Sequence, residues 1–367
     1  MKGILISGYY GFGNSGDDAL LYTIISEFKK LGLDKYITVL SSNPSETKKM
    51  YGVKAVNRIN PFSILFNMIK CRLFISGGGT LIQDGTSTKS LLYYLGLIQM
   101  ACLLHKKTML YANGIGPVNK PSNREKCTKV LNKTDVITVR DKRSLDVLRD
   151  LSIDKPLIKL TADPVFLMEE SEDVSRITDK IGVGEFYCVS IRPSRTMKET
   201  FKEDVSEALD RFCTENNIKA VFLPLQQRDL ELSKQICSLM TTEPLLIEEK
   251  LTPKEIIALV GKSKITVGMR LHMLIYASVA KVPLVGIVYD TKVSGFMEYT
   301  GQDLFVNDSE LSVDNLYELM NESIQNYDEI KLQLSDIKDK LTRLAKENVA
   351  VAESLYKSGQ RGNQIEK

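Results

Sequence analysis

The sequence predicts an α/β protein built from two doubly wound domains, each around a parallel β-sheet. The chain has 367 residues, which exceeds the size at which a single hydrophobic core usually stops growing. Short runs of β-branched residues alternate with segments of helix length, the order typical of βαβ units. Apolar residues make up 43% of the chain and charged residues 26%, so both domains can fill a core.

The first series of apolar runs predicts an N-terminal domain over residues 1–170. These runs are GILISG (3–8), YITVLSS (36–42), RLFISGG (72–78), TMLYANG (108–114) and DVITVR (135–140). The acidic, proline-containing stretch at residues 162–179 interrupts the series, as an interdomain connection does. We therefore expect the domain boundary in this stretch.

A second series predicts another domain over residues 171–310. Its expected strands are FYCVSIRP (186–193), IKAVFLPLQ (218–226), PLLIEE (244–249), KITVGMR (264–270) and PLVGIVYD (283–290). Helical patterns lie between them, such as PKEIIALVG (253–261) and LHMLIYASVA (271–280). Residues 311–367 are charged and helical in period, and we expect C-terminal helices there that pack back on the first domain.

The charge balance and the cysteines exclude some classes of protein. With 49 Lys and Arg against 46 Asp and Glu, the chain has no field strong enough to predict nucleic-acid binding. Its six cysteines are scattered and none forms a CxxC pair, which favours a reducing cytoplasm over a disulfide framework.

The uncharged run at residues 91–104 is shorter than the roughly 20 residues that a helix needs to span a bilayer. A buried helix is the expected structure. The alternative is an interfacial surface that meets lipid, with Tyr93 and Tyr94 at the level of the headgroups.

The loop after the first expected strand is rich in glycine and leads into a helix. It reads GYYGFGNSGDDA (8–19) and contains the pattern G-x-G-x-x-G at Gly11, Gly13 and Gly16. Such a turn lets backbone N–H groups approach an anion at the positive end of a helix. The second strand is not followed by the carboxylate of dinucleotide-binding domains, so NAD binding is not predicted.

Two carboxylates stand at the end of this loop. Asp17 is either an N-cap of the first helix or a contact to a ligand. Asp18 is predicted to face the ligand, because a carboxylate there could polarise a sugar hydroxyl.

Later strands of the first domain are also followed by small or charged residues. Three adjacent glycines at residues 77–79 are expected to end a strand and begin a helix, and they indicate close approach either to a ligand or to another loop. The same loop continues to Gln83 and Asp84, and Asn113 opens a further glycine turn. Arg140 ends another strand, as an anion clamp or as the partner of a neighbouring carboxylate.

The strongest feature of the second domain is GMRLH (268–272), which follows a strand and opens a helix. Arg270 offers a planar cation and His272 a titratable imidazole in one turn. Lys292 follows the next strand, as a further cation of the site or as a solvated lysine, and Arg192 ends an earlier strand. Several cations at strand ends suit a small ligand with more than one negative group. The sequence has no Walker pattern and no residues at metal-ligand spacing, so we expect no metal.

Eight loop motifs in register resemble the polysaccharide pyruvyl transferase family. They run from residue 8 to about residue 292 and cover both domains: GYYGFGNSGDDA, SGGGTLIQD, NGIGPV, VRD, ADPVF, SIRP, FLPLQ and GMRLHM. The chain is most similar to the S-layer-anchoring cell-wall branch, whose members start with the same strand and aromatic glycine turn. It departs from that pattern at Asp18, where close relatives are expected to carry glutamate.

The resemblance implies a fold like that of GT-B glycosyltransferases, with two Rossmann-like domains facing across a cleft and no metal. It implies phosphoenolpyruvate as co-substrate, with no other cofactor, and a lipid-linked, ManNAc-containing disaccharide as acceptor. Two acceptor hydroxyls become bridged by a pyruvate ketal, and phosphate is released. We therefore expect a cytoplasmic enzyme that can contact the inner face of the membrane peripherally, and no nucleic-acid partner.

The predicted site residues divide between the two domains. The family's donor-binding arginine, histidine and lysine fall on Arg140, His272 and Lys292, and Arg270 and Arg192 are added to the donor site. The predicted catalytic residues are His272, Arg270, Lys292 and Asp18. Acceptor binding is assigned to the first domain, at Asn14, Asp17, Asp18, Gly78, Gly79, Gln83, Asp84 and Asn113.

Two other functions are compatible with the sequence. A GT-B glycosyltransferase that uses a nucleotide sugar would share the paired domains and the glycine loops, and it would bind a nucleotide in the second domain. A non-catalytic module that binds a sugar or an anion would share the loops alone.

Overall fold

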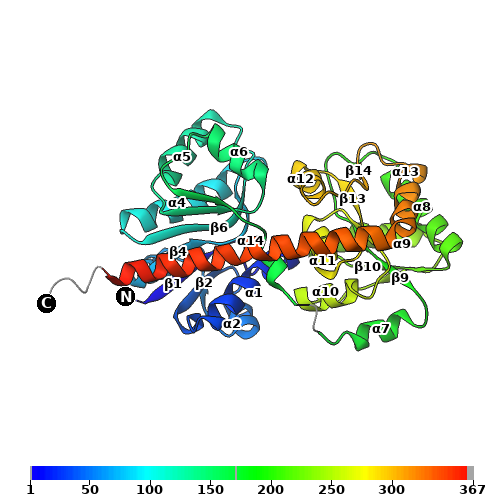
Figure 1. Cartoon of the computed structure of the whole chain (residues 1–367), viewed down its shortest axis with the longest axis horizontal. Helices are drawn as coiled ribbons and strands as arrows, with labels where there is room; N and C mark the ends of the chain where they lie inside the picture. The colour runs from blue at the N-terminus through cyan, green and yellow to red at the C-terminus, as the bar shows by residue number, and fades with distance from the viewer. Residues whose placement is uncertain (1, 170–171, 362–367) are drawn as a thin grey trace. The chain divides into compact units, whose positions relative to one another are not determined.

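The computed structural model describes residues 2–169 and 172–361, which form two compact α/β units (Figure 1). Unit 1 comprises Met1–Gly13, Asp17–Leu167 and Leu341–Lys367, and unit 2 comprises Asn14–Gly16 and Met168–Lys340. Each unit is built on its own parallel sheet, which confirms the predicted fold class.

The sheet of unit 1 has the strand order β3-β2-β1-β4-β6-β7-β8, with β5 paired to β6. The strands are β1 (Gly3–Ser7), β2 (Ile37–Ser41), β3 (Lys54–Asn57), β4 (Cys71–Ser76), β5 (Gly79–Ile82), β6 (Lys107–Ile115), β7 (Val136–Val139) and β8 (Leu157–Leu160). The order reverses between β1 and β4, and in such sheets ligands bind beyond the carboxyl ends of the strands at this switch point.

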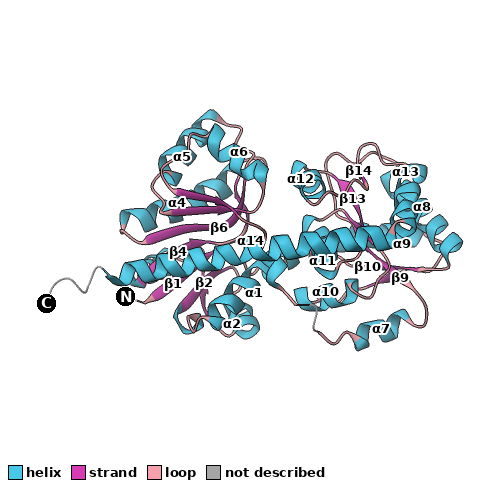
Figure 2. Ribbon diagram, viewed as in Figure 1, coloured by secondary structure: helices cyan, strands magenta, loops and turns pink. Residues whose placement is uncertain are grey.

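Helices cover both faces of this sheet, as Figure 2 shows. They are α1 (Ser15–Lys30), α2 (Pro44–Tyr51), α3 (Pro61–Lys70), α4 (Thr88–Leu103), α5 (Pro121–Leu131) and α6 (Lys142–Asp150). Alternate residues of β1 enter different cores: Leu5 packs with α3 and α4 residues, whereas Ile4 and Ile6 pack with α1 residues. Burial on both faces explains why the strands of a parallel sheet are apolar throughout.

The glycine run at residues 77–79 does not begin a helix, so that prediction is wrong. Gly79 starts β5, where it pairs with Asn113 of β6, and Ile82 pairs with Ile115. Helix α4 begins only at Thr88, after the cap residue Ser87. A run of glycine followed by the buried residues Leu81 and Ile82 fits a short strand, because strand pairing satisfies the backbone without requiring helix formers.

Unit 2 repeats the architecture with the strand order β11-β10-β9-β12-β13-β14. Its strands are β9 (Phe186–Ser190), β10 (Lys219–Phe222), β11 (Leu245–Leu246), β12 (Thr266–Gly268), β13 (Leu284–Val288) and β14 (Phe305–Asn307). Its helices are α7 (Ser175–Ile181), α8 (Phe201–Asn216), α9 (Gln227–Leu239), α10 (Pro253–Val260), α11 (Leu271–Ala280), α12 (Thr291–Tyr299) and α13 (Val313–Gln325). The order reverses between β9 and β12, which places the second switch point there.

The long helix α14 (Tyr327–Arg361) starts in unit 2, and its residues from Leu341 onward belong to unit 1. Ala352 and Tyr356 lie in the core of unit 1, and the Tyr356 hydroxyl donates to the carbonyl of Lys2 at 2.8 Å. The segment for which we predicted packing on the first domain therefore includes core residues of unit 1. Its end, residues 362–367, lies outside the described residues.

The apolar run at residues 91–104 forms most of α4, as the prediction of a helix requires. Tyr94 is buried, and the Arg58 guanidinium lies 4.5 Å from the ring centre of Tyr93 and 5.5 Å from that of Tyr94. The alternative that Tyr94 faces lipid headgroups is therefore wrong, whereas Tyr93 is partly exposed. None of the helices within residues 2–169 and 172–361 is both long and apolar enough to cross a membrane.

Candidate functional site

Four neighbouring strands of unit 2 deliver a cation each to the carboxyl edge of the sheet. In the order β10-β9-β12-β13, these strands are followed by Arg228, Arg192, Arg270 and Lys292. Because the strands are parallel and adjacent, their following loops meet at one edge, which includes the switch point between β9 and β12. We call these four side chains the cation cluster.

Arg270 is the buried member of the cation cluster and is held by a carboxylate. Its Nε donates to Asp229 Oδ2 at 2.6 Å, and its Nη2 donates to Asp229 Oδ1 at 2.5 Å and to Gln226 Oε1 at 3.0 Å. Asp229 is fully buried and the Arg270 side chain is 8% exposed. This two-point pairing fixes the plane of the guanidinium, so Arg270 is a rigid cation.

Arg192 and Lys292 both contact Tyr289, the first residue after β13. Arg192 Nη1 donates to the Tyr289 hydroxyl at 2.6 Å, and its guanidinium lies 4.2 Å from the ring centre. Lys292 Nζ lies 5.3 Å from the same ring and 3.3 Å from Asp290 Oδ2. These two cations are partly exposed, so an anion can reach them.

Arg228 was not predicted from the sequence. It is exposed at the second position of α9, and its pKa is lowered because partial desolvation disfavours its charge and because Arg270 and Arg192 lie nearby. Like charges held this close repel each other and favour an added anion. The sequence signal was present in FLPLQQRD (222–229), which follows β10, but only its first part was used.

His272 lies in the first turn of α11, two residues after Arg270, as predicted. The segment Asn14–Gly16 packs against this helix within unit 2: the Ser15 hydroxyl lies 2.9 Å from that of Tyr276, and Ser15 N–H donates to Leu225 C=O at 3.0 Å. A Cβ on Gly16 would lie 2.1 Å from Nδ1 of His272. The last glycine of the G-x-G-x-x-G pattern is therefore required by contact with the imidazole.

The cation cluster can bind a ligand with several anionic oxygens. Asp229 pairs with Arg270, and Asp290 lies 3.3 Å from Lys292, so the charges of Arg192 and Arg228 remain in excess over these two carboxylates. Helices α9 and α11 also begin here with no side chain capping their first turn, and their N–H groups favour negative charge. Within the described part of the chain, His, Cys, Asp and Glu form no group of three or more that could hold a metal ion.

Arg140 in unit 1 forms the buried ion pair that the sequence left as an alternative to an anion clamp. Its Nη1 donates to Asp163 Oδ2 at 2.8 Å, its Nη2 donates to Thr80 Oγ1 at 3.3 Å, and its Nε lies 3.8 Å from Asp141 Oδ2. The side chains of Arg140 and Asp163 are 6% and 5% exposed. The guanidinium thus contacts β5 and the loops after β7 and β8.

The glycine run of unit 1 is required by its protein neighbours. A Cβ on Gly77 would lie 2.1 Å from the Tyr10 hydroxyl, and one on Gly78 would lie 2.9 Å from Leu20. Gly79 has φ +96°, and a Cβ there would lie 3.0 Å from Asp17 Oδ1. The sequence left open whether this run approaches a ligand or another loop. The structure shows it packed closely against the loop after β1 and against α1.

Three residues predicted to bind the acceptor, Asn113, Gln83 and Asp84, make hydrogen bonds to other residues of unit 1. Asn113 is fully buried and its amide donates to the carbonyls of Ser76 and Gly77 at 3.0 and 2.7 Å. Gln83 bonds to Thr86 of its own loop. These contacts hold the edge of the sheet in shape.

Asp84 links the loop after β5 to the start of α5 by hydrogen bonds. Its carboxylate accepts from the N–H groups of Asn119 and Lys120 and from the amide of Asn123, at 2.8, 3.0 and 2.8 Å. Burial raises the pKa of Asp84, but these hydrogen bonds outweigh it and lower the pKa below the ordinary aspartate value.

The first turn of α1 places the remaining predicted residues. The Asn14 Oδ1 accepts from Gly16 N–H at 3.3 Å immediately before the helix, so Asp17 lies inside the first turn and the reading of Asp17 as N-cap is wrong. Asp17 and Asp18 are both buried, with 7% and 5% exposure. Asp17 lies close enough to Tyr10 to raise its pKa, after the larger effect of burial.

An exposed aromatic pair stands in the loop after β1. The rings of Tyr9 and Phe12 stack with their centres 4.1 Å apart and an interplanar angle of 11°. Arg58 lies 5.1 Å from the Phe12 ring centre, and its Nη1 donates to Gly8 C=O at 3.3 Å. The sequence reasoning noted the aromatic character of this turn but assigned these residues no role.

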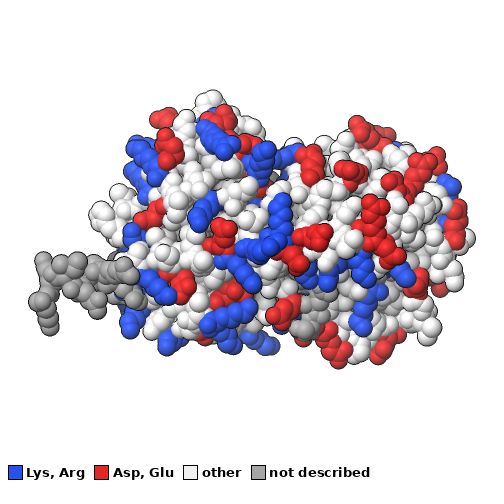
Figure 3. All heavy atoms as spheres, in the orientation of Figure 1, with Lys and Arg blue, Asp and Glu red and all other residues white. Residues whose placement is uncertain are grey.

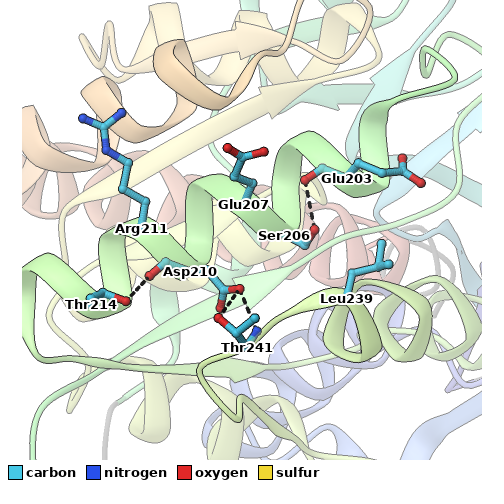
Figure 4. A pocket seen from close by; sticks show the side chains of 8 residues that line it. All are labelled: Glu203, Ser206, Glu207, Asp210, Arg211, Thr214, Leu239 and Thr241. Atoms are coloured by element: carbon cyan, nitrogen blue, oxygen red, sulfur yellow. Dashed lines mark hydrogen bonds between the residues drawn. The ribbon is translucent and has the colours of Figure 1, made fainter.

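A surface pocket on α8 and α9 holds none of the predicted residues (Figure 4). Asp210 points across it, and its carboxylate accepts from Thr241 N–H at 2.7 Å and from Thr242 N–H at 3.1 Å. Glu203 and Glu207 add negative charge. This pocket does not suit an anion.

A model of the family described as polysaccharide pyruvyl transferase matches residues 14–291 of the chain. A search of curated proteins found no match. The matched region runs from Asn14, just before α1, to Thr291, the first residue of α12. It therefore contains Arg192, Arg228 and Arg270 of the cation cluster and ends one residue before Lys292.

Several solved structures share the fold at low sequence identity. A putative UDP-N-acetylglucosamine 2-epimerase from Listeria monocytogenes is 11% identical with a TM-score of 0.70, and 98% of each chain is covered. S. aureus MnaA, solved with UDP, is 11% identical with a TM-score of 0.69 over 98% of this chain and 97% of that one. A glycosyltransferase from Rickettsia africae is 10% identical with a TM-score of 0.64 over 98% and 99%. These likenesses establish a fold of the GT-B type.

Proposed function

Because the chain belongs to the polysaccharide pyruvyl transferase family, we propose that it transfers the enolpyruvyl group of phosphoenolpyruvate to a cell-wall saccharide and releases phosphate. The proposed acceptor is a lipid-linked, ManNAc-containing disaccharide of the S-layer-anchoring branch, presented at the cytoplasmic face of the membrane. The observation that carries the proposal is the cation cluster at the switch point of unit 2.

The donor carries a carboxylate and a phosphate, which together need more positive charge than one arginine supplies. Arg270, fixed by Asp229, is suited to hold one anionic group in a set plane. Arg192, Arg228 and Lys292 are exposed enough to meet the other group. We add Arg228 to the donor residues for this reason.

His272 is the proposed proton donor in the first step. Protonation of the donor's methylene carbon makes it a methyl group, and the oxygen of one acceptor hydroxyl bonds to the adjacent carbon as its own proton leaves. The oxygen of the second hydroxyl then displaces phosphate from that carbon, and its proton is lost as well. Arg270 and Lys292 would stabilise the departing phosphate.

Unit 1 is the proposed acceptor side. Asp18 would accept a hydroxyl proton, and Asp17, Gly78 and Gly79 of the same unit are further proposed acceptor residues. Asn14, also assigned to the acceptor, belongs to the short segment Asn14–Gly16 of unit 2. The internal hydrogen bonds of Gln83, Asp84 and Asn113 support a role in positioning these loops. Arg140 enters as a donor residue from the resemblance alone, and its pairing with Asp163 favours positioning as well.

The test is a comparison of ligands on the wild-type chain. A ligand that binds only the folded state raises the melting temperature, so phosphoenolpyruvate should raise it and UDP-sugars should not. The UDP-bound structural neighbour makes the second arm necessary. Stabilisation by a UDP-sugar alone would favour a nucleotide-sugar glycosyltransferase.

A separate experiment measures the reaction. Phosphate release from phosphoenolpyruvate should depend on a lipid-linked acceptor, and the product should gain the mass of a pyruvate ketal. Binding of phosphoenolpyruvate without phosphate release for any acceptor tested would leave a non-catalytic anion-binding module.

A further inference from the structure

Helix α3 of unit 1 presents an apolar stripe to solvent. Phe62, Leu65, Phe66 and Ile69 are 84%, 43%, 56% and 49% exposed, and Ile59 just before the helix is 77% exposed. The spacing i, i+3, i+4, i+7 places the four helical residues on one face. The opposite face, with Ile64 and Met68, is buried in the core of unit 1. An exposed apolar stripe of this kind marks an interaction surface.

The chain around α3 carries almost no negative charge. Residues 47–124 contain 11 Lys and Arg and a single acidic residue, Asp84. That carboxylate is buried and accepts three hydrogen bonds, so it adds little negative charge to the surface. Lys70 at the end of α3 is exposed and its Nζ lies 3.8 Å from the Phe66 ring centre. Lys106 Nζ donates to the carbonyl of Ile69 at 2.7 Å.

Unit 1 as a whole is also positively charged, whereas unit 2 is negatively charged. Unit 1 holds 29 Lys and Arg against 16 Asp and Glu, and unit 2 holds 20 against 30. The near-neutral whole chain therefore conceals a positive unit and a negative unit. Figure 3 shows Lys and Arg predominating on the visible face of unit 1 and many Asp and Glu on that of unit 2.

From these observations we infer that unit 1 docks on an anionic lipid surface through α3. A helix with exposed phenylalanine, leucine and isoleucine on one face lies in the membrane interface with that face among the acyl chains. Lysines beside the apolar face add attraction to anionic headgroups. An anionic bilayer offers both an apolar interior for the stripe and negative headgroups for the cations of unit 1. A protein partner would not need to carry negative charge, so it accounts for the stripe alone.

This inference does not depend on the proposed reaction. It assigns a place to the peripheral membrane contact, for which the sequence offered residues 91–104 only as an alternative to a buried helix. Six residues of that segment are buried, namely Leu91, Tyr94, Leu95, Leu97, Ile98 and Ala101. The contact lies on α3, whose exposed residues the family motifs do not include.

The experiment is vesicle sedimentation of the full chain. Vesicles of equal parts phosphatidylglycerol and phosphatidylcholine should bind it, with affinity that falls as salt rises, and vesicles of phosphatidylcholine alone should bind it much less. Replacing Phe62 and Phe66 by serine should weaken binding at least about tenfold, because each buried aromatic ring contributes more than the 1.4 kcal/mol of a tenfold change. Lys70→Gln should weaken it about fivefold.

The control replaces exposed apolar residues outside α3. A variant with Leu157→Ser and Leu332→Ser, at positions 53% and 67% exposed, should bind vesicles as the wild type does. Phe62→Ser alone, at the most exposed position of the stripe, checks the result if the double variant folds poorly. Unchanged melting temperatures show that the variants are folded.

Three results would overturn the inference. The wild type does not sediment with anionic vesicles; or it binds zwitterionic vesicles equally well; or the α3 variants bind like the wild type. A dimer in solution that the Phe62 and Phe66 substitutions dissociate, without vesicle binding, would assign α3 to a second copy of the chain.

Discussion

Removal of Arg228 should stabilise the ligand-free protein and weaken its binding of the proposed donor, phosphoenolpyruvate. Arg228 has two positive neighbours, Arg192 and Arg270, and the charge of Arg270 is largely offset by Asp229. The net effect is repulsion by about one unit of positive charge. Because Arg228 is partly exposed, water screens this repulsion, and two charges a few ångströms apart in water interact by about 1 kcal/mol.

Arg228→Ala should therefore raise the melting temperature of the ligand-free protein by about 2–4 °C, the shift that 1 kcal/mol produces in a unit of 150–250 residues. The substitution should weaken the binding of phosphoenolpyruvate and of inorganic phosphate about 10- to 100-fold, because a hydrogen bond to a charged group contributes about 1.5–3 kcal/mol. Scanning calorimetry gives both values, from the transition without ligand and from its shift with ligand concentration.

The matched control is Arg176→Ala in the same unit. Arg176 pairs with Glu249 at 2.8 Å and with Glu255 at 2.5 Å, away from the cation cluster. Its loss should not raise the melting temperature and should not change the affinity for phosphoenolpyruvate. If Arg228→Ala instead lowers the melting temperature, or leaves both affinities within twofold of the wild type, the electrostatic reasoning for Arg228 is refuted.

Three further predictions concern the rest of the molecule. His272→Ala should lower kcat by about 10²-fold or more with folding intact. Gly16→Ala should also lower kcat, because its Cβ would displace the imidazole of His272. The control Gly96→Ala, where no atom lies within 4 Å of an added Cβ, should leave kcat unchanged, and steady-state rates of the three variants check this. Asp229→Ala should destabilise unit 2 by about 3–5 kcal/mol, since it leaves Arg270 buried without its partner, and a urea midpoint equal to the wild type's would contradict this. Burial raises the pKa of the thiols of Cys71, Cys127, Cys188 and Cys237 from 9.0 to about 12, so the unfolded chain ionises first and stability should fall as the pH rises above 9. Alkylation of the native protein at pH 8.5 should be about 10³-fold slower than that of unfolded thiols. Rapid native labelling of Cys71, Cys127 or Cys188, the buried ones among these four, would contradict this.

The strands and the loops that follow them were predictable because their signals are local. A buried parallel strand is apolar along its length, and each run is bounded by glycine or a charged residue. His272 after β12 and Lys292 after β13 were placed from this pattern alone. The same locality explains the error at Gly79, where a short strand and a helix start share the same residues.

The partners of buried charges could not be predicted, because they come from distant loops. Arg140 pairs with Asp163, 23 residues on, and Arg270 pairs with Asp229, 41 residues back. Arg228 was overlooked because its role depends on its neighbours Arg192 and Arg270, which follow β9 and β12. The exposed face of α3 was overlooked because its sequence, PFSILFNMIK, is apolar on both sides and reads as a core helix.

The buried and exposed cations of the chain have different physical roles. Arg140 and Arg270 are paired with buried carboxylates, so removal of either partner leaves a charge in a low dielectric, and neither can move freely to meet a ligand. Arg192, Arg228 and Lys292 lie at the surface without such enclosure, and their mutual repulsion is relieved when an anion binds. A rigid arginine that sets the geometry, surrounded by exposed cations whose repulsion favours the anion, gives both orientation and affinity. This division explains why the charge of Arg270 is neutralised by Asp229 while its guanidinium stays aligned: the pair serves position, and the exposed members supply the attraction.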